Sequence, residues 1–135
     1  MALNLVEESN QFQPDFKKLA YFNHMDVLPV VVQHFKTKDI LILAYVNELA
    51  LNEAIRQKKA VFWSTSRNEL WVKGATSGDF LQLNEVRVNC EQNSLLYLVT
   101  PVQGGVCHTK DEDGNARLTC FYRRVNSDFS LSFLC

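Results

Sequence analysis

The fold is decided by residues 28–46, which read LPVVVQHFKTKDILILAYV from Leu28 to Val46. Two apolar runs flank the polar turn Lys36-Thr37-Lys38-Asp39. Aliphatic and β-branched residues on both sides of such a turn are typical of a β-hairpin, here with strands over about 28–35 and 39–46. Neither run alternates between apolar and polar residues, so we expect both faces of the hairpin to be covered.

A helix is predicted over residues 48–58, directly after the hairpin. Asn47 is a favourable N-cap, and Glu48 places a negative charge in the first turn, where the helix dipole favours it. Apolar residues recur four apart, as at Ala50 and Ala54, so one side of the helix should face the core.

Short strands account for most of the remaining chain. We predict them over residues 60–64, 70–73, 79–90, 94–102 and 119–125, with a short helix over 14–22 and an alternating apolar tail over 126–135. No repeat or linker divides the sequence, so residues 1–135 are predicted to form a single compact, strand-rich α+β domain.

Composition and charge exclude several classes of protein. The 135 residues include 14 Lys and Arg against 15 Asp and Glu, which gives no broad basic surface for nucleic acid or membrane lipids. No apolar run approaches the ~18 residues of a membrane span, and residues 1–10 contain no apolar signal core. We therefore expect a cytoplasmic protein whose four cysteines are reduced, with Cys135 incidental.

Three cysteines and a histidine gather in the last third of the chain, at Cys90, Cys107-His108 and Cys120. Thiolate and imidazole groups are preferred zinc ligands, and three protein ligands with an open fourth position are typical of a catalytic site. The intervals are longer than those of zinc fingers. Spacing alone therefore leaves two interpretations, a zinc ligand set or buried, inert cysteines.

The end of the predicted strand 79–90 carries a second polar group. If Val86 and Val88 face the core, strand alternation points Cys90 the same way. The opposite side then carries three oxygen-bearing side chains, which could hold a hard cation or simply be solvated: Asn89, Glu91 and Asn93.

Several stretches, in order over about residues 28–124, resemble the phosphoribosyl-AMP cyclohydrolase family. They are LPVVVQ from Leu28, LAYVN from Leu43, FWSTSR from Phe62, LWVKGATSG from Leu70, CHT from Cys107 and CFYR from Cys120. The resemblance implies hydrolysis of the bond between N1 and C6 of the adenine in phosphoribosyl-AMP, the third step of histidine biosynthesis. It also implies an intertwined homodimer.

The resemblance implies two metals. The family's zinc ligands, shared across the dimer interface, correspond to Cys90, Cys107 and Cys120. Its three magnesium-binding aspartates correspond to Asn89, Glu91 and Asn93. One carboxylate and two amides make a poor magnesium site, so we expect Zn²⁺ and regard Mg²⁺ as a doubtful cofactor.

Two further departures from the family pattern stand out. The link between Cys107 and Cys120 is longer than usual and carries Asp111-Glu112-Asp113, which could lend a carboxylate to a cation or form a surface loop. Thr65 stands where the family commonly has an arginine, which removes one candidate phosphate contact.

His108 is the predicted catalytic residue. An imidazole beside a metal ligand can shuttle protons near neutral pH, although it could also be a structural group or a fourth zinc ligand. The expected substrate-binding residues are Arg67, Trp71, Lys73, Gly74, Ser77, Gly78, Thr109 and Arg123. Their cations could equally be solvated, and Trp71 could be a core aromatic.

The leading prediction is a zinc-dependent phosphoribosyl-AMP cyclohydrolase. One alternative is a divergent paralogue that acts on another purine-like nucleotide or ring amidine, as the changed set Asn89, Glu91 and Asn93 would allow. The other alternative is a zinc-stabilised module without catalytic activity.

Overall fold

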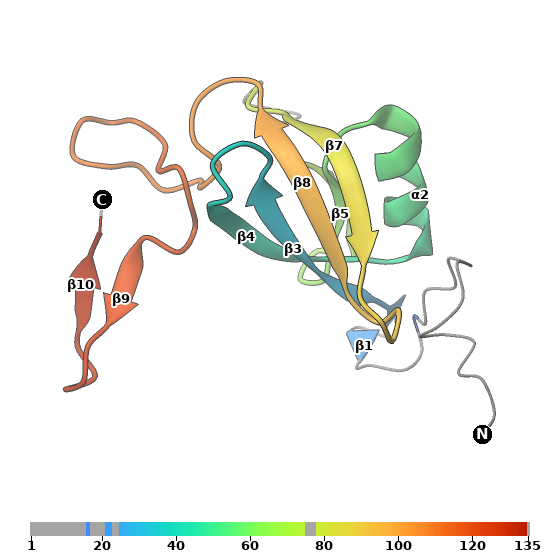
Figure 1. Ribbon diagram of the computed structural model, residues 1–135, viewed down its shortest axis with the longest axis horizontal. Helices are drawn as coiled ribbons and strands as arrows, with labels where there is room; N and C mark the ends of the chain where they lie inside the picture. Colours follow the sequence, from blue (N-terminus) through green and yellow to red (C-terminus); the bar gives the residue numbers. More distant parts are fainter. Residues whose placement is uncertain (1–15, 17–20, 23–24, 75–77, 135) are drawn as a thin grey trace.

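A four-stranded sheet forms the centre of the computed structural model, which describes residue 16 and residues 21–22, 25–74 and 78–134. The order of its strands is β4-β3-β8-β7 (Figure 1). The described elements are β1 (Tyr21–Phe22), β2 (Met25–Asp26), β3 (Leu28–His34), β4 (Ile40–Val46), α2 (Glu48–Gln57), β5 (Val61–Ser64), β6 (Glu69–Val72), β7 (Leu81–Val88), β8 (Leu95–Pro101), β9 (Arg123–Val125) and β10 (Leu131–Phe133).

The hairpin predicted over 28–46 is confirmed. β3 and β4 are antiparallel, with Val30 opposite Ala44. β8 joins the other side of β3 in parallel, and β7 pairs with β8 in the antiparallel sense. Two parallel strands need a long connection between them. Between β3 and β8 the chain forms β4, α2, the β5–β6 hairpin and β7.

The helix is also confirmed, as α2. The Oδ1 atom of Asn47 accepts a hydrogen bond of 2.9 Å from the N–H of Ala50, which caps the first turn. Ala50 and Ala54 are buried, and Lys58 ends the helix in a left-handed conformation with φ of 56°. The strand-rich α+β domain with one main helix is therefore correct for the part of the chain that the structure describes.

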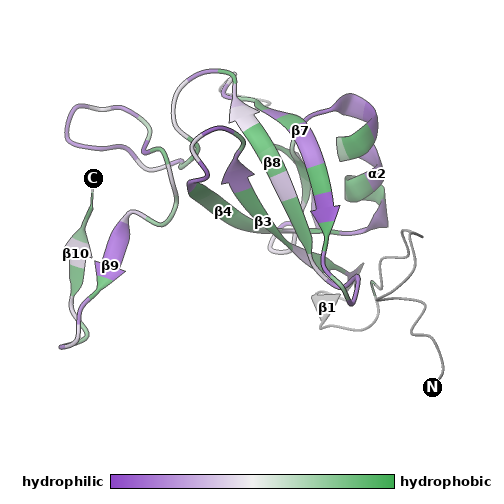
Figure 2. Ribbon diagram, viewed as in Figure 1, coloured by the Kyte–Doolittle hydropathy of each residue, from purple (hydrophilic) through white to green (hydrophobic). Residues whose placement is uncertain are grey.

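One face of the sheet is covered and the other is open in a single chain. Val30, Val32 and Tyr97 are fully buried, in one core cluster with residues of α2 and β5. Leu43, which points to the other face of β4, is 48% exposed. The expectation that both faces of the hairpin are covered is thus wrong for one chain, although apolar residues run along these strands (Figure 2).

Two predicted strands are shorter than expected. β7 ends at Val88 instead of residue 90, and a register shift between Leu83 and Glu85 alters which side chains face the core. Val88 is itself exposed, so the condition under which Cys90 was expected to face the core is not met, and Cys90 lies exposed in the turn after β7. Strand 119–125 is reduced to β9, because Thr119 bonds to the carbonyls of β4 only through its hydroxyl and Cys120 through one N–H, without a strand ladder.

The remaining predicted elements agree closely or fall outside the description. β5, β6 and β8 match their predicted ranges within one residue at each end. Most of the helix predicted over 14–22 lies outside the described residues, but Tyr21–Phe22 form strand β1, so that helix does not reach Phe22. The alternating tail contributes β10, which pairs with β9 in a hairpin that projects from the sheet (Figure 1).

Candidate functional site

Cys107 and Cys120 lie side by side beyond the end of β8. The N–H of Cys107 donates to the carbonyl of Arg117 at 2.9 Å, and the N–H of Cys120 donates to the carbonyl of Leu41 in β4 at 2.8 Å. Gly105 permits this packing, because a Cβ atom there would lie 2.2 Å from the carbonyl oxygen of Ala116. Backbone pairing thus brings together two cysteines that are separated by a loop.

The two thiols differ in acidity. Burial alone would raise the pKa of Cys107, but hydrogen bonds from Thr109 and Cys120 and the charge of Arg117 lower it below the ordinary value. Burial, followed by the charge of Cys107, raises the pKa of Cys120 to about 11, although Lys73 opposes this. Cys107 is therefore the thiol that ionises first, with two cations, Lys73 and Arg117, close to the pair.

Thr109 holds the Cys107 sulfur in place. Its hydroxyl oxygen lies 2.9 Å from the Sγ atom, and its N–H donates to the same sulfur at 3.4 Å. His108 stands between these two residues and is exposed. The predicted catalytic histidine and one predicted substrate-binding residue therefore lie at the thiol pair.

Cys90 is far from this pair within one chain. It lies in the turn before β8, whereas Cys107 follows the other end of β8 (Figure 1). A strand of this length spans roughly 20 Å at about 3.3 Å per residue. In the described part of the chain, no three His, Cys, Asp or Glu side chains are grouped closely enough to hold a metal ion. One chain therefore assembles two of the three predicted zinc ligands.

Asn89, Glu91 and Asn93 come together, but mainly through bonds to one another. The Oδ1 atom of Asn89 accepts from the N–H groups of Asn93 and Ser94, both at 2.9 Å. The side-chain amide of Asn89 donates to Asn93 Oδ1 at 2.7 Å, and the amide of Asn93 donates to Glu91 Oε2 at 3.3 Å. These bonds stabilise the turn between β7 and β8 and occupy oxygens that a cation would need.

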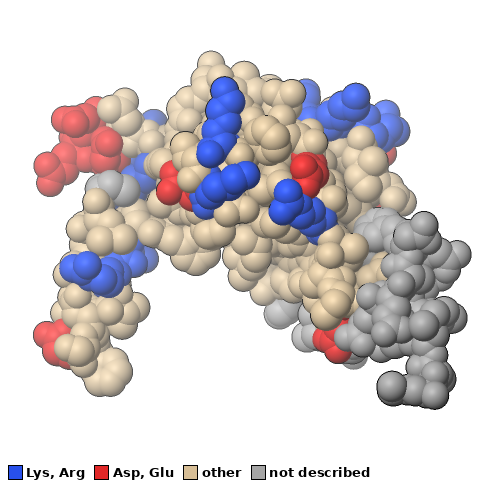
Figure 3. Space-filling view, in the orientation of Figure 1, with Lys and Arg blue, Asp and Glu red and all other residues tan. Residues whose placement is uncertain are grey.

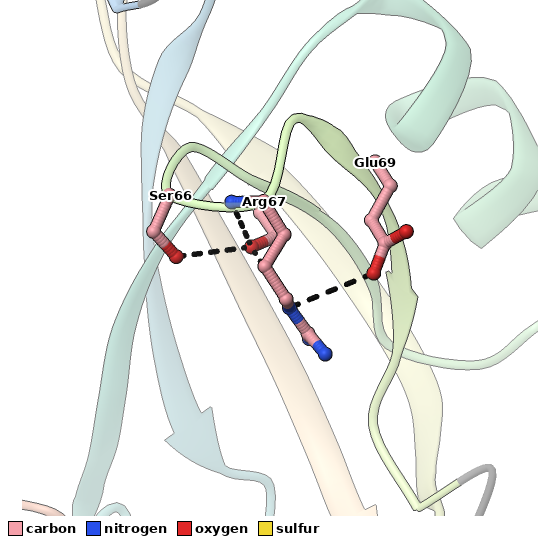
Figure 4. Close-up of polar contacts among 4 residues, drawn as sticks. Ser66, Arg67 and Glu69 are labelled. Carbon is pink, nitrogen blue, oxygen red and sulfur yellow. Dashed lines mark hydrogen bonds and ion pairs between the residues drawn. The ribbon is translucent and has the colours of Figure 1, made fainter.

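Arg67 lies in the turn of the β5–β6 hairpin and already has an anionic neighbour. Its Nε atom is 3.6 Å from a carboxylate oxygen of Glu69, and its backbone N–H donates to the hydroxyl of Ser64 at 3.2 Å (Figure 4). Arg123 lies in β9, with its guanidinium 5.0 Å from the ring centroid of Tyr122. Both side chains are exposed.

Several predicted substrate-binding positions have clear structural roles. The ring of Trp71 packs at 5.4 Å from that of Phe62, against the core. Gly74 has φ of 89°, and a Cβ atom there would lie 2.4 Å from the backbone of Asp79. Gly78 closes the same turn by donating to the carbonyl of Gly74. Ser77 lies outside the described residues.

The acidic link between Cys107 and Cys120 is a loop at the surface. The Oδ1 atom of Asp111 accepts from the N–H groups of Asp113 and Asn115, both at 3.0 Å. Figure 3 shows acidic side chains grouped at this end of the molecule, whereas Lys and Arg are scattered over the face in view. Sequence reasoning missed Arg117, which ends this loop; its only signal was a cation between the two cysteines.

A family model described as "PRA-CH: Phosphoribosyl-AMP cyclohydrolase" matches residues 42–122, which is more than half of the chain. The chain belongs to this family. The match includes all three predicted zinc-binding cysteines and ends just before β9. Family membership confirms the predicted resemblance and makes the chain a hydrolase of the cyclohydrolase class.

Individual relatives agree with this assignment. A phosphoribosyl-AMP cyclohydrolase of Chloroherpeton thalassium is 33% identical over 96% of this chain and 88% of the relative. One from Archaeoglobus fulgidus is 43% identical over 79% of this chain and 93% of the relative. A histidine biosynthesis bifunctional protein HisIE of Staphylococcus epidermidis is 37% identical over 80% of this chain and 48% of its own length. Among the described residues, no helix is long and apolar enough to span a membrane.

Proposed function

We propose that this chain is a zinc-dependent phosphoribosyl-AMP cyclohydrolase that works in the cytoplasm as a homodimer. Its reaction would be the third step of histidine biosynthesis, in which water opens the adenine ring between N1 and C6. The observation that carries the proposal is the pair of thiols at Cys107 and Cys120, held beside His108 within the segment that the family model matches.

The donor set fits zinc. Cys107 and Cys120 offer two soft ligands, and the hydrogen bonds around Cys107 favour its ionised form. Cys90 of the partner subunit would supply the third thiolate and leave the fourth position open. When bound, zinc supplies a Lewis acid that makes water a nucleophile near neutral pH.

The donor set does not fit magnesium. Mg²⁺ prefers carboxylates and gives up its water reluctantly. Only Glu91 carries a charge among the three candidate residues, and the amides of Asn89 and Asn93 are hydrogen-bonded within the turn. We therefore assign no step to magnesium at this position.

The dimer is proposed because one chain leaves both a site and a surface incomplete. Cys90 and Cys107 lie at opposite ends of β8, so a second copy would supply the third ligand. The open face of the sheet offers apolar contacts, since Val31 lies between Leu43 of β4 and Leu96 of β8. In a symmetric dimer, one such arrangement would complete two sites at once.

In the proposed mechanism, His108 moves the proton. Its imidazole would accept a proton from the water that attacks C6 and deliver that proton to N1 as the C6–N1 bond breaks. The water oxygen stays on C6 as the carboxamide oxygen, its second proton passes to the exocyclic nitrogen on C6, which becomes the amide NH2, and N1 leaves within the formimino group. Lys73 and Arg117, close to the thiol pair, would offset its negative charge.

Substrate contacts are proposed from the position of each predicted residue relative to the thiol pair and from its exposure. Thr109 and Lys73 lie at the thiol pair and are well placed to meet a bound nucleotide. Arg67 and Arg123 are exposed cations that could bind the phosphates, although Arg67 would have to exchange its neighbour Glu69. Trp71, Gly74 and Gly78 would act mainly by shaping the adjacent turn.

The test compares two histidine variants of the zinc-loaded protein. His108→Ala should lower kcat for ring opening of phosphoribosyl-AMP by about 10²–10⁴-fold and leave the zinc content unchanged. His34→Ala is the matched control, because His34 lies outside the segment that the family model matches and caps the turn between β3 and β4 by accepting from the N–H of Lys36 at 3.1 Å. A chelator should abolish wild-type activity, and zinc should restore it.

Other outcomes separate the remaining functions. Wild-type protein that holds zinc without opening the ring of phosphoribosyl-AMP would favour the divergent paralogue or the non-catalytic module. Loss of zinc in His108→Ala would make this histidine a ligand, and unchanged turnover would remove it from the mechanism.

A further inference from the structure

The guanidinium of Arg117 packs against two aromatic rings at the C-terminal end of the chain. It lies 4.2 Å from the ring centroid of Tyr122 and 5.4 Å from that of Phe133. The two rings are themselves 5.7 Å apart and tilted by 57°. Contacts of this kind attract a cation to the face of a ring and restrict where a flexible arginine side chain can go.

The backbone of Arg117 is fixed to the loop that carries Cys107. Its carbonyl accepts from the N–H of Cys107 at 2.9 Å, and its N–H donates to the carbonyl of Thr109 at 3.1 Å. Arg117 is therefore linked to the thiol loop by its main chain and to the C-terminal hairpin by its side chain.

The hairpin is well suited to hold a side chain in place. The N–H of Leu134 donates to the carbonyl of Tyr122 at 2.8 Å, which ties the end of β10 to the start of β9. Across the hairpin, the amide of Asn126 donates to the hydroxyl of Ser132 at 2.8 Å. Phe133, which pairs with Arg123 across the hairpin, thus has a defined position against the ring of Tyr122.

The position of this cation matters because it lies between carboxylates and the thiol pair. Arg117 and Phe133 line a cavity of about 620 Å³ together with the carboxylates of Asp111, Glu112 and Asp113. The backbone of Arg117 is hydrogen-bonded to Cys107 at 2.9 Å, and the ring on which its guanidinium packs belongs to Tyr122, two residues after Cys120. Three thiolates around one Zn²⁺ carry a net charge of about −1, which a fixed neighbouring cation would stabilise.

We propose that the C-terminal hairpin is a positioning element for the metal centre: Phe133 and Tyr122 hold the Arg117 guanidinium beside Cys107, where its charge stabilises the thiolate ligand set. This inference rests on the proposed zinc function. It gives a role to β10, which lies beyond the segment that the family model matches.

The test measures how fast zinc leaves the full-length protein when a chromophoric chelator is added. Phe133→Leu, which removes the ring, should release zinc several-fold faster than wild type, and Phe133→Tyr should restore the wild-type rate. Phe129→Leu is the matched control, because Phe129 lies on the same hairpin and is 91% exposed. The thiolate-to-cobalt charge-transfer band of the Co²⁺-substituted protein should shift in Phe133→Leu and not in Phe129→Leu.

A second variant covers the case in which Phe133→Leu disturbs the hairpin. Arg117→Gln leaves both rings in place and removes only the charge, so it should release zinc about tenfold faster than wild type, and Arg117→Lys should recover part of that loss. Equal release rates for wild type, Phe133→Leu and Arg117→Gln would overturn the inference and leave the zinc function intact. Wild-type protein that binds no zinc would overturn both.

Discussion

Two inactive variants of this chain should restore each other's activity if the proposed site is shared. Cys90→Ser removes the ligand in the turn before β8, and Cys107→Ser removes a ligand beyond its other end. In a mixed dimer, Cys90 of one chain meets the pair Cys107 and Cys120 of the other. One of the two sites then lacks both mutated ligands, whereas the second site keeps all three.

The expected recovery follows from counting intact sites. An equal mixture with free exchange of subunits contains about half mixed dimers, and each has one intact site out of two. Activity and bound zinc should therefore reach about a quarter of the wild-type values, whereas each variant alone stays near zero. The assay follows ring opening of phosphoribosyl-AMP and measures zinc by elemental analysis, with native mass spectrometry to verify that mixed dimers form.

The structure also supplies a negative control. Cys107 and Cys120 lie together in one chain, so a mixture of Cys107→Ser and Cys120→Ser leaves a broken pair in every site of every dimer. This mixture should stay inactive. Recovery in this control, or no recovery when mixed dimers of Cys90→Ser and Cys107→Ser are present, would refute the shared site.

Three further predictions concern stability. Asn47→Ala should lower the free energy of unfolding in urea by about 1 kcal/mol through loss of the α2 cap, whereas the exposed control Asn52→Ala should change it little. Tyr97→Phe should keep or increase stability, by up to ~1 kcal/mol, because the buried hydroxyl has no hydrogen-bond partner among the described residues; a clear loss would contradict this. In metal-free protein, folding raises the pKa of Cys120 from 9.0 to about 11, so the folded state favours the neutral thiol. The resulting stability is present below pH 9 and is lost as the pH rises towards 11. In unfolding experiments, Cys120→Ser should therefore lose less stability at alkaline pH than wild type.

The sequence was most informative where local rules decide the structure. The turn at 36–39 and its apolar flanks predicted the β3–β4 hairpin, and Asn47 predicted the start of α2. These features depend on residues close together in the chain, so the spacing of apolar residues and the chemistry of helix caps are enough to find them.

Other features depend on parts of the chain that only the folded structure brings together. The exposed position of Cys90 was missed, because alternation from Val86 and Val88 cannot foresee that the strand ends before it. The exposure of Leu43 depends on what covers the sheet. The contact between Arg117 and Phe133, sixteen residues later in the chain, depends on how the C-terminal hairpin folds back.

A shared metal site links zinc binding to association of the chains. β8 separates Cys90 from Cys107 by a whole strand, so movement of a loop cannot bring them together within one chain. If the proposed site is correct, a single chain would offer zinc two thiolates and a dimer would offer three. Thermodynamic linkage is reciprocal. If dimerisation raises the affinity for zinc by some factor, zinc raises the affinity between the two chains by the same factor. Removal of zinc should thus weaken association most strongly in dilute protein, and the proposed metal centre would form only where two chains meet.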